Sequence, residues 1–169
     1  LMPQVEEVKE KGYEILYLTD YADEFVVQVL QNYDNKKFLN VASSEVNLEN
    51  EEEKKEVEKL NTESKDLLDK MKEVLKEKVT SVKFTNSLKK HPVCLTSEGA
   101  ISTGMEKVLN SMPTNEKVKA STVLSINASH PIAKKIKELY KTNPEEIEKY
   151  TKILYAQAKL IEGLTLDNP

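Results

Sequence analysis

Residues 79–98, VTSVKFTNSLKKHPVCLTSE, contain the two short stretches that decide the fold class. In 79–85 the side chains of Val82 and Phe84 fall on one face of an extended chain, as in a strand that buries one side. Residues 92–96 form a second extended stretch. Helical periodicity lies on both sides of this pair, so the sequence predicts a mixed α/β fold.

Upstream of this pair, apolar residues at steps of three and four predict an amphipathic helix. The stripe comprises Val57, Leu60, Ser64, Leu67, Leu68, Met71, Val74 and Leu75. Both a helix packed on a domain core and a short coiled-coil seam fit this pattern, and the two alternatives stay open here.

Downstream, the helical period returns at Ile101, Met105, Val108, Leu109 and Met112. Residues 120–126 predict a third strand, and Pro131 suits the first turn of another helix. Residues 143–146 (NPEE) predict the start of a last helix, because a capping residue, a proline and two acids follow one another. Gly163 ends that helix, whose stripe is Ile147, Tyr150, Leu154, Ala158 and Ile161.

Residues 1–45 predict a separate small α/β subdomain. Its elements are a strand at 15–18, a helix capped by Thr19 or Asp20, a turn at 33–35 and a strand at 38–41. An acidic tract poor in apolar residues follows, so we take 46–58 as a linker that runs into the long helix. Residues 59–169 then form a second, α+β domain.

Charge and composition exclude several classes of protein. The 25 basic residues are all lysine, and 29 acids bring the net charge to -4, which argues against a nucleic-acid-binding surface. A mean hydropathy of -0.56 and a charged first segment predict neither a membrane span nor an export signal. The single cysteine, Cys94, fits a reducing compartment, so we expect a cytoplasmic protein.

No catalytic, cofactor-binding or metal-binding constellation is predicted. Residues 99–104 have the glycine spacing of a phosphate loop, but Met105 and Glu106 replace the lysine and hydroxyl that such a loop requires. His91 and Cys94 fall on opposite faces of an extended chain, and two histidines with one cysteine make no zinc site. A catalytic role for Cys94 stays open only if its thiol proves reactive.

The order of several segments resembles the ninety-kilodalton heat-shock chaperones, in their bacterial branch. The similar segments are residues 11–20 (KGYEILYLTD), 23–25 (DEF), 33–37 (YDNKK), 49–55 (ENEEEKK), 82–88 (VKFTNSL), 92–97 (PVCLTS), 105–106 (ME), 125–127 (SIN), 130–131 (HP) and 166–169 (LDNP). The similarity extends over essentially the whole chain and is collinear.

This resemblance implies a carboxy-terminal fragment of an ATP-dependent chaperone of the stress response. It joins the end of the middle domain to the carboxy-terminal dimerisation domain. The ATP and Mg²⁺ site of such a chaperone lies in earlier domains, so the resemblance implies no enzymatic activity and no cofactor in this chain. The partners that it implies are a second copy and partly folded client proteins.

The resemblance also implies roles for two helices. The segment 101–112 corresponds to an amphipathic helix that faces clients, through Ile101, Met105, Val108 and Leu109, to which we add Met112. The helix after Pro144 corresponds to one of two helices of a four-helix dimer interface, through Ile147, Tyr150, Leu154, Ala158 and Ile161, and the second helix is expected after Pro169. His91 departs from the family, which usually has serine there. The alternative function is a structural coiled-coil or adaptor module built on residues 57–78.

Overall fold

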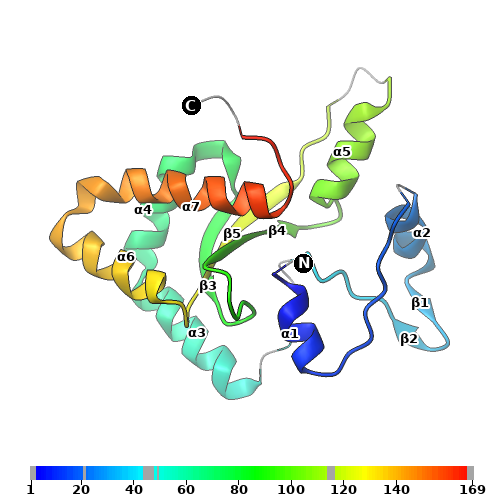
Figure 1. Ribbon diagram of the computed structural model, residues 1–169, viewed down its shortest axis with the longest axis horizontal. Coiled ribbons are helices and arrows are strands. Elements are labelled where there is room, and N and C mark those ends of the chain that lie inside the picture. The colour runs from blue at the N-terminus through cyan, green and yellow to red at the C-terminus, as the bar shows by residue number, and fades with distance from the viewer. Residues whose placement is uncertain (1–2, 21, 44–47, 49, 114–116, 167–169) are drawn as a thin grey trace.

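A three-stranded sheet lies at the centre of the computed structural model, which describes residues 3–20, 22–43, 48, 50–113 and 117–166 (Figure 1). The strands are β3 (Ser81–Thr85), β4 (Val93–Glu98) and β5 (Ser121–Asn127), in the spatial order β3-β5-β4. β5 runs parallel to β3 and antiparallel to β4. The predicted mixed α/β fold is confirmed, and each predicted strand of this region is present within a few residues of its expected bounds.

Three helices build the hydrophobic core with this sheet. They are α4 (Lys65–Leu75), α6 (Pro131–Thr142) and α7 (Ile147–Ile161). α4 and α7 pack against each other, α4 on β3 and α7 on β4 (Figure 1). The core comprises Leu67, Leu68, Met71, Leu75, Val79, Val82, Phe84, Val93, Leu95, Leu124, Ile126, Ala133, Ile136, Ile147, Leu154 and Ala158.

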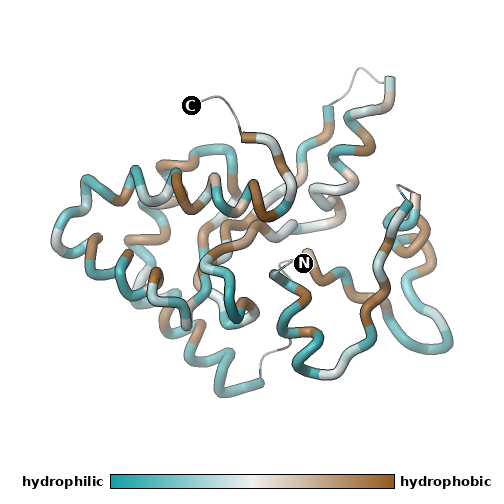
Figure 2. Tube along the Cα trace, viewed as in Figure 1, coloured by the Kyte–Doolittle hydropathy of each residue, from teal (hydrophilic) through white to brown (hydrophobic). Residues whose placement is uncertain are grey.

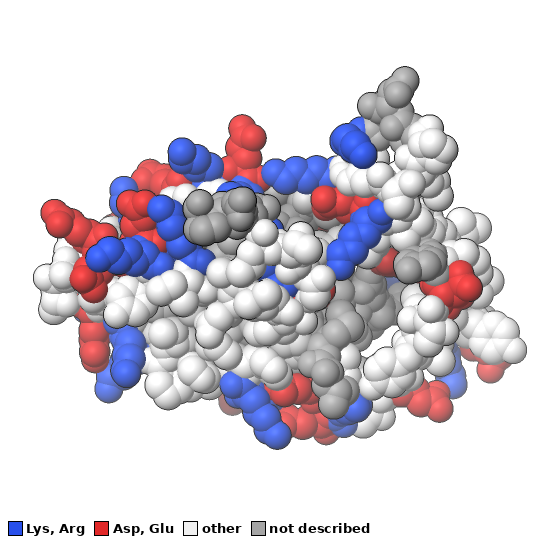
Figure 3. Space-filling view, turned by 45° about the horizontal axis from the view of Figure 1, so that its top comes forward, with Lys and Arg blue, Asp and Glu red and all other residues white. Residues whose placement is uncertain are grey.

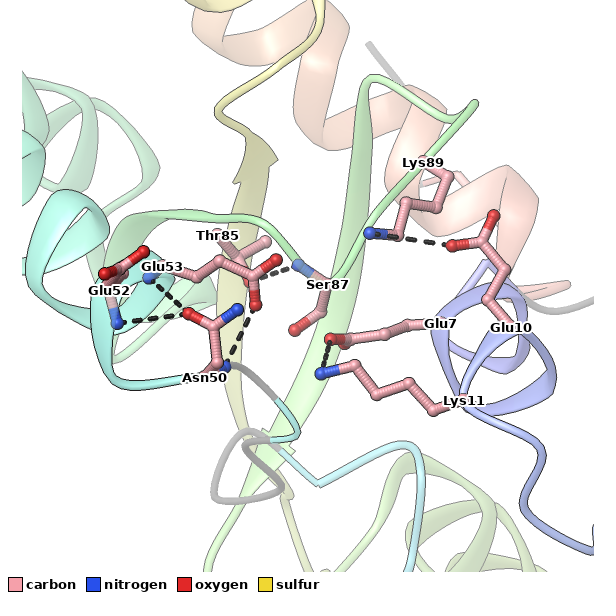
Figure 4. Close-up of polar contacts among 9 residues, drawn as sticks. All are labelled: Glu7, Glu10, Lys11, Asn50, Glu52, Glu53, Thr85, Ser87 and Lys89. Carbon is pink, nitrogen blue, oxygen red and sulfur yellow. Dashed lines mark hydrogen bonds and ion pairs between the residues drawn. The ribbon is translucent and has the colours of Figure 1, made fainter.

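The stripe predicted over residues 57–75 belongs to two helices that meet at Ser64, α3 (Glu51–Glu63) and α4. The acidic run forms the first turn of α3, where Asn50 and Glu53 complete a capping box (Figure 4). Asn61 of α3 accepts a hydrogen bond from the Phe84 N–H at 2.8 Å and so fixes α3 against β3. The apolar face of α4 is buried inside the chain, which leaves no seam for a coiled coil.

Helix starts and turns follow local rules at several positions. His130 caps α6 through Nδ1, which accepts a hydrogen bond from the Ile132 N–H at 3.2 Å. A 3₁₀ turn, η2 (Pro144–Glu146), precedes α7, and η1 (Lys76–Lys78) follows α4. Gly163 has φ +65° just beyond α7, as expected for a glycine that ends a helix.

The amino-terminal part differs from the prediction. After α1 (Val5–Glu10), residues 13–19 form neither helix nor strand, and no described strand pairs with them. α2 (Asp23–Leu30) follows, and Asp20, one of the two predicted caps, accepts a hydrogen bond through Oδ1 from the Ala22 N–H at 3.1 Å just before the helix. Asp23 Oδ2 in turn accepts from the Thr19 and Asp20 N–H groups. The next strand pair is a short hairpin, β1 (Asn32–Tyr33) with β2 (Lys36–Lys37), instead of a strand at 38–41.

The predicted turn inside this hairpin is present. Asp34 and Asn35 both have positive φ, which suits the two-residue turns that close tight hairpins. The predicted subdomain boundary near residue 45 falls within 44–47, outside the described residues.

Candidate interaction surfaces

α7 carries two apolar stripes on different faces, and the structure buries one of them. Ile147, Leu154 and Ala158, three of the residues expected at a dimer interface, lie in the core against β4 and α4. Ile161 is half-buried. Only Tyr150 of the predicted set is exposed, so a surface interface on α7 must use a different face of the helix.

The exposed stripe of α7 consists of Tyr150, Ile153 and Leu160, with exposed fractions of 41%, 55% and 59%. The exposed Gln157 lies between Ile153 and Leu160, so the steps along the stripe are three, four and three. This is the spacing at which one helix packs its side chains along another. Residues Ile153 and Leu160 were not predicted, although the same 3-4 spacing in the sequence could have indicated them.

α5 (Thr103–Ser111) projects from the sheet between β4 and β5 (Figure 1). Ser102 caps it by accepting from the Met105 N–H at 3.0 Å. Ile101, Val108 and Leu109 of the predicted client-facing set are half-buried. Met105 is buried in the chain's own packing, which removes it from that surface, whereas Met112 is exposed just after the helix.

Two polar side chains hold α5 to the chain that returns toward β5. Glu106 accepts from the Ala120 N–H at 2.8 Å, and Asn110 pairs through its amide with the backbone N–H and C=O of Val118. Gln28 of α2 donates to the Ala100 carbonyl, so α2 lies beside the start of the α5 segment. The α5 position therefore depends on polar contacts more than on burial.

A further apolar surface lies on residues 13–39. Its exposed large residues are Tyr13, Leu16, Tyr17, Leu18, Val26, Val29, Leu30, Tyr33 and Leu39. α2 buries none of its residues (Figure 2). The sequence pattern marked 15–18 and α2 as apolar, but it predicted burial and so missed this surface.

The described residues form neither a reactive thiol site nor a metal-binding cluster. Burial, followed by the negative charge of Glu162, raises the pKa of the Cys94 thiol to about 12, so the thiol is protonated at neutral pH. Within the described ranges no group of three or more His, Cys, Asp or Glu could hold a metal ion. Lysines and acids are interspersed over the face in Figure 3. Among the described helices none is long and apolar enough to cross a membrane.

The family model described as "Hsp90 protein" matches residues 1–169, the whole chain. The chain belongs to the Hsp90 family. Curated relatives named "Chaperone protein HtpG" are 46% identical over 168 residues, 99% of this chain, in Clostridium botulinum (strain Loch Maree / Type A3) and in Alkaliphilus oremlandii (strain OhILAs). A third, from Clostridium perfringens (strain 13 / Type A), is also 46% identical over 168 residues.

The chain spans only 27% of the length of the first two of these Hsp90-family relatives. That matched part is assigned to their amino-terminal region, which carries the ATPase. This assignment contradicts the prediction that the chain is not an enzyme, and the exclusion of ATP hydrolysis is withdrawn. A chaperone role in the Hsp90 family is supported by the relatives.

Proposed function

We propose that this chain supplies protein–protein contacts of an Hsp90-family chaperone: self-association through the exposed stripe of α7 and client contact through the α5 segment. Hsp90-family chaperones form dimers and bind clients, which supports both partners. The proposal includes the carboxy-terminal position and the division into 1–45 and 59–169. The collinear motifs support that position, and the two contact surfaces do not depend on whether the chain hydrolyses ATP.

The observation that carries self-association is the position of the exposed stripe on a well-anchored helix. The side chains of Ile147, Leu154 and Ala158 pack in the core and hold α7 in place. The exposed face of the helix is therefore held in a fixed position. Tyr150, Ile153 and Leu160 then form an apolar strip along a helix of about 22 Å, at 1.5 Å per residue. A second copy of α7 presents the same strip, and two such strips bury each other in a self-complementary contact.

Variants on α7 test this contact. Ile153→Glu with Leu160→Glu places two charges in the strip without touching the core, so we expect the self-association constant to fall at least about tenfold. Glu148→Lys is the matched control, because Glu148 is exposed on the same helix but lies about 120–160° around it from the strip. Sedimentation equilibrium gives the constants. Equal association of the double variant and the wild type contradicts the proposal.

Client contact is supported by the composition and position of the α5 segment. Val108 and Leu109 are apolar and half-buried, Met112 is 46% exposed, and the methionine side chain adapts to partners of different shape. The helix projects away from the sheet (Figure 1).

Suppression of aggregation of a reduced, unfolded test protein measures client contact. We expect Leu109→Glu with Met112→Glu to weaken suppression about fivefold or more, whereas Lys107→Gln on the same helix leaves it unchanged. Met105 is unsuitable for this test, since its burial links it to folding. Unchanged suppression by the double variant, with circular dichroism showing an intact fold, rejects the client role.

A further inference from the structure

α5 is a helix with little stability of its own. It has nine residues, Thr103–Ser111, and Gly104 lies in its first turn. Isolated helices shorter than about 12–15 residues are marginal in water, and glycine is a poorer helix former than any residue except proline. The order of α5 therefore depends on contacts with the rest of the chain.

α2 supplies contacts of this kind at the start of α5 (Figure 1). The side-chain amide of Gln28 donates to the Ala100 carbonyl, just before the cap of α5. Glu24, one turn earlier in α2, points its carboxylate at the first turn, because a Cβ atom on Gly104 would lie 3.0 Å from Glu24 Oε2. Asn40 donates to the other oxygen of Glu24 at 3.2 Å. We call Glu24, Gln28 and Asn40 the α2 clasp.

The charge of Glu24 suits this position. The first turn of a helix carries a partial positive charge on its unpaired N–H groups, so a carboxylate beside it is stabilising. Ser102 already accepts from the Met105 N–H, and the carboxylate of Glu106 is engaged by the Ala120 N–H. Glu24 therefore brings a further negative charge to this turn from a distant part of the chain.

Gly104 leaves room for the α2 clasp. Its backbone is helical and has no positive φ, so the conformation itself does not require glycine. Alanine at this position would favour the helix. Its Cβ atom, however, would meet Glu24 Oε2 at 3.0 Å and Ser102 Oγ at 3.4 Å. The missing side chain therefore serves the contact with α2 and not the folding of α5.

We propose that the α2 clasp orders α5 and thereby regulates client binding, an inference that rests on the client contact proposed above. While α2 is docked, Val108 and Leu109 are presented on an ordered helix. α2 buries none of its own residues, so few apolar contacts oppose its release. When α2 moves away, α5 loses this support, and a client must pay the cost of ordering the helix, which weakens binding.

Amide hydrogen exchange of the 169-residue chain tests the clasp without a client. Glu24→Gln keeps an oxygen for Asn40 but removes the charge, so we expect protection in peptides that cover residues 103–111 to fall about two- to fivefold. Asp34→Asn is the matched control, because it removes an acid from the β1–β2 turn and asparagine tolerates the positive φ there. Wild-type protection of α5 in Glu24→Gln, or an equal loss in Asp34→Asn, refutes the clasp.

A double-mutant cycle separates the clasp from helix propensity. In a Glu24→Ala background, Gly104→Ala displaces no carboxylate, and we expect the gain in propensity to raise the protection of α5 about fivefold. In the wild type the same substitution also pushes Glu24 away, so the gain should be at least about twofold smaller and the protection of α2 should fall. Equal gains in the two backgrounds contradict the contact.

The aggregation assay tests the link between the clasp and clients. We expect Glu24→Gln to weaken suppression at least about twofold and Asp34→Asn to leave it unchanged. If the protection of α5 falls in Glu24→Gln but suppression stays at the wild-type level, the clasp does not regulate client binding and the inference is wrong. Unchanged suppression by Leu109→Glu with Met112→Glu rejects the proposed client role instead, and the exchange results show separately whether the clasp exists.

Discussion

Two adjacent residues of α7, Leu154 and Ile153, are expected to differ sharply in what they contribute to folding. Leu154 is 3% exposed and lies in the core, whereas Ile153 is 55% exposed. Leu154→Ala removes roughly three methylene-sized groups, worth about 0.8 kcal/mol each, and leaves a cavity besides. We expect a loss of about 3 kcal/mol in the free energy of unfolding. Ile153→Ala should change it by no more than about 0.5 kcal/mol.

Urea denaturation at a protein concentration low enough to prevent association measures both values. In thermal unfolding the same loss lowers the Tm of the Leu154→Ala variant by about 6–12 °C for a chain of this size. An unchanged slope of free energy against urea concentration shows that the two variants unfold from comparable states. The assignment of the α7 faces is refuted if Leu154→Ala costs less than about 1 kcal/mol, or if Ile153→Ala costs as much as Leu154→Ala.

Two further predictions follow from buried titratable groups. The Cys94 thiol, whose pKa burial raises from 9.0 to about 12, should react with a thiol reagent near pH 8 roughly a thousandfold more slowly in the folded than in the urea-unfolded chain; comparable rates contradict its burial and restore the catalytic alternative. Burial also raises the pKa of Glu162 above its ordinary value of 4.5, so the folded chain binds this proton more tightly than the unfolded chain and stability falls as pH rises past 4.5. Glu162→Gln keeps an acceptor for Gln4 and should therefore be more stable than the wild type at pH 7, with the difference shrinking toward pH 4; a difference that does not vary with pH excludes this cause.

The sequence predicted best those elements whose apolar period is satisfied inside the chain. β3 and α4 are examples, because their alternating or 3-4 spaced side chains find partners in one core. The stretch 15–18 has an equally apolar pattern, but a strand also needs a neighbouring strand to bond its backbone, and no described strand pairs with it. Leu16, Tyr17 and Leu18 are exposed. The local sequence pattern therefore predicted the tendency to form a strand, but not whether another strand pairs with it.

The candidate surfaces were harder to predict for a related physical reason. α7 has two stripes with helical spacing, one through Leu154 and one through Ile153, and the sequence alone does not decide which of them packs on β4 and α4. The contact between Glu24 and the first turn of α5 joins residues far apart in the chain and has no local signal. The cap at His130, by contrast, depends only on adjacent residues.

The mass of the chain in solution across a wide concentration range tests the central claim, that the exposed stripe of α7 joins two copies. Sedimentation equilibrium of the wild type should give a mass that rises from 19.2 kDa toward twice that value, whereas Ile153→Glu with Leu160→Glu should stay at 19.2 kDa over the same range. A wild type that remains at 19.2 kDa up to about millimolar concentration contradicts the claim. So does a double variant that associates as the wild type does.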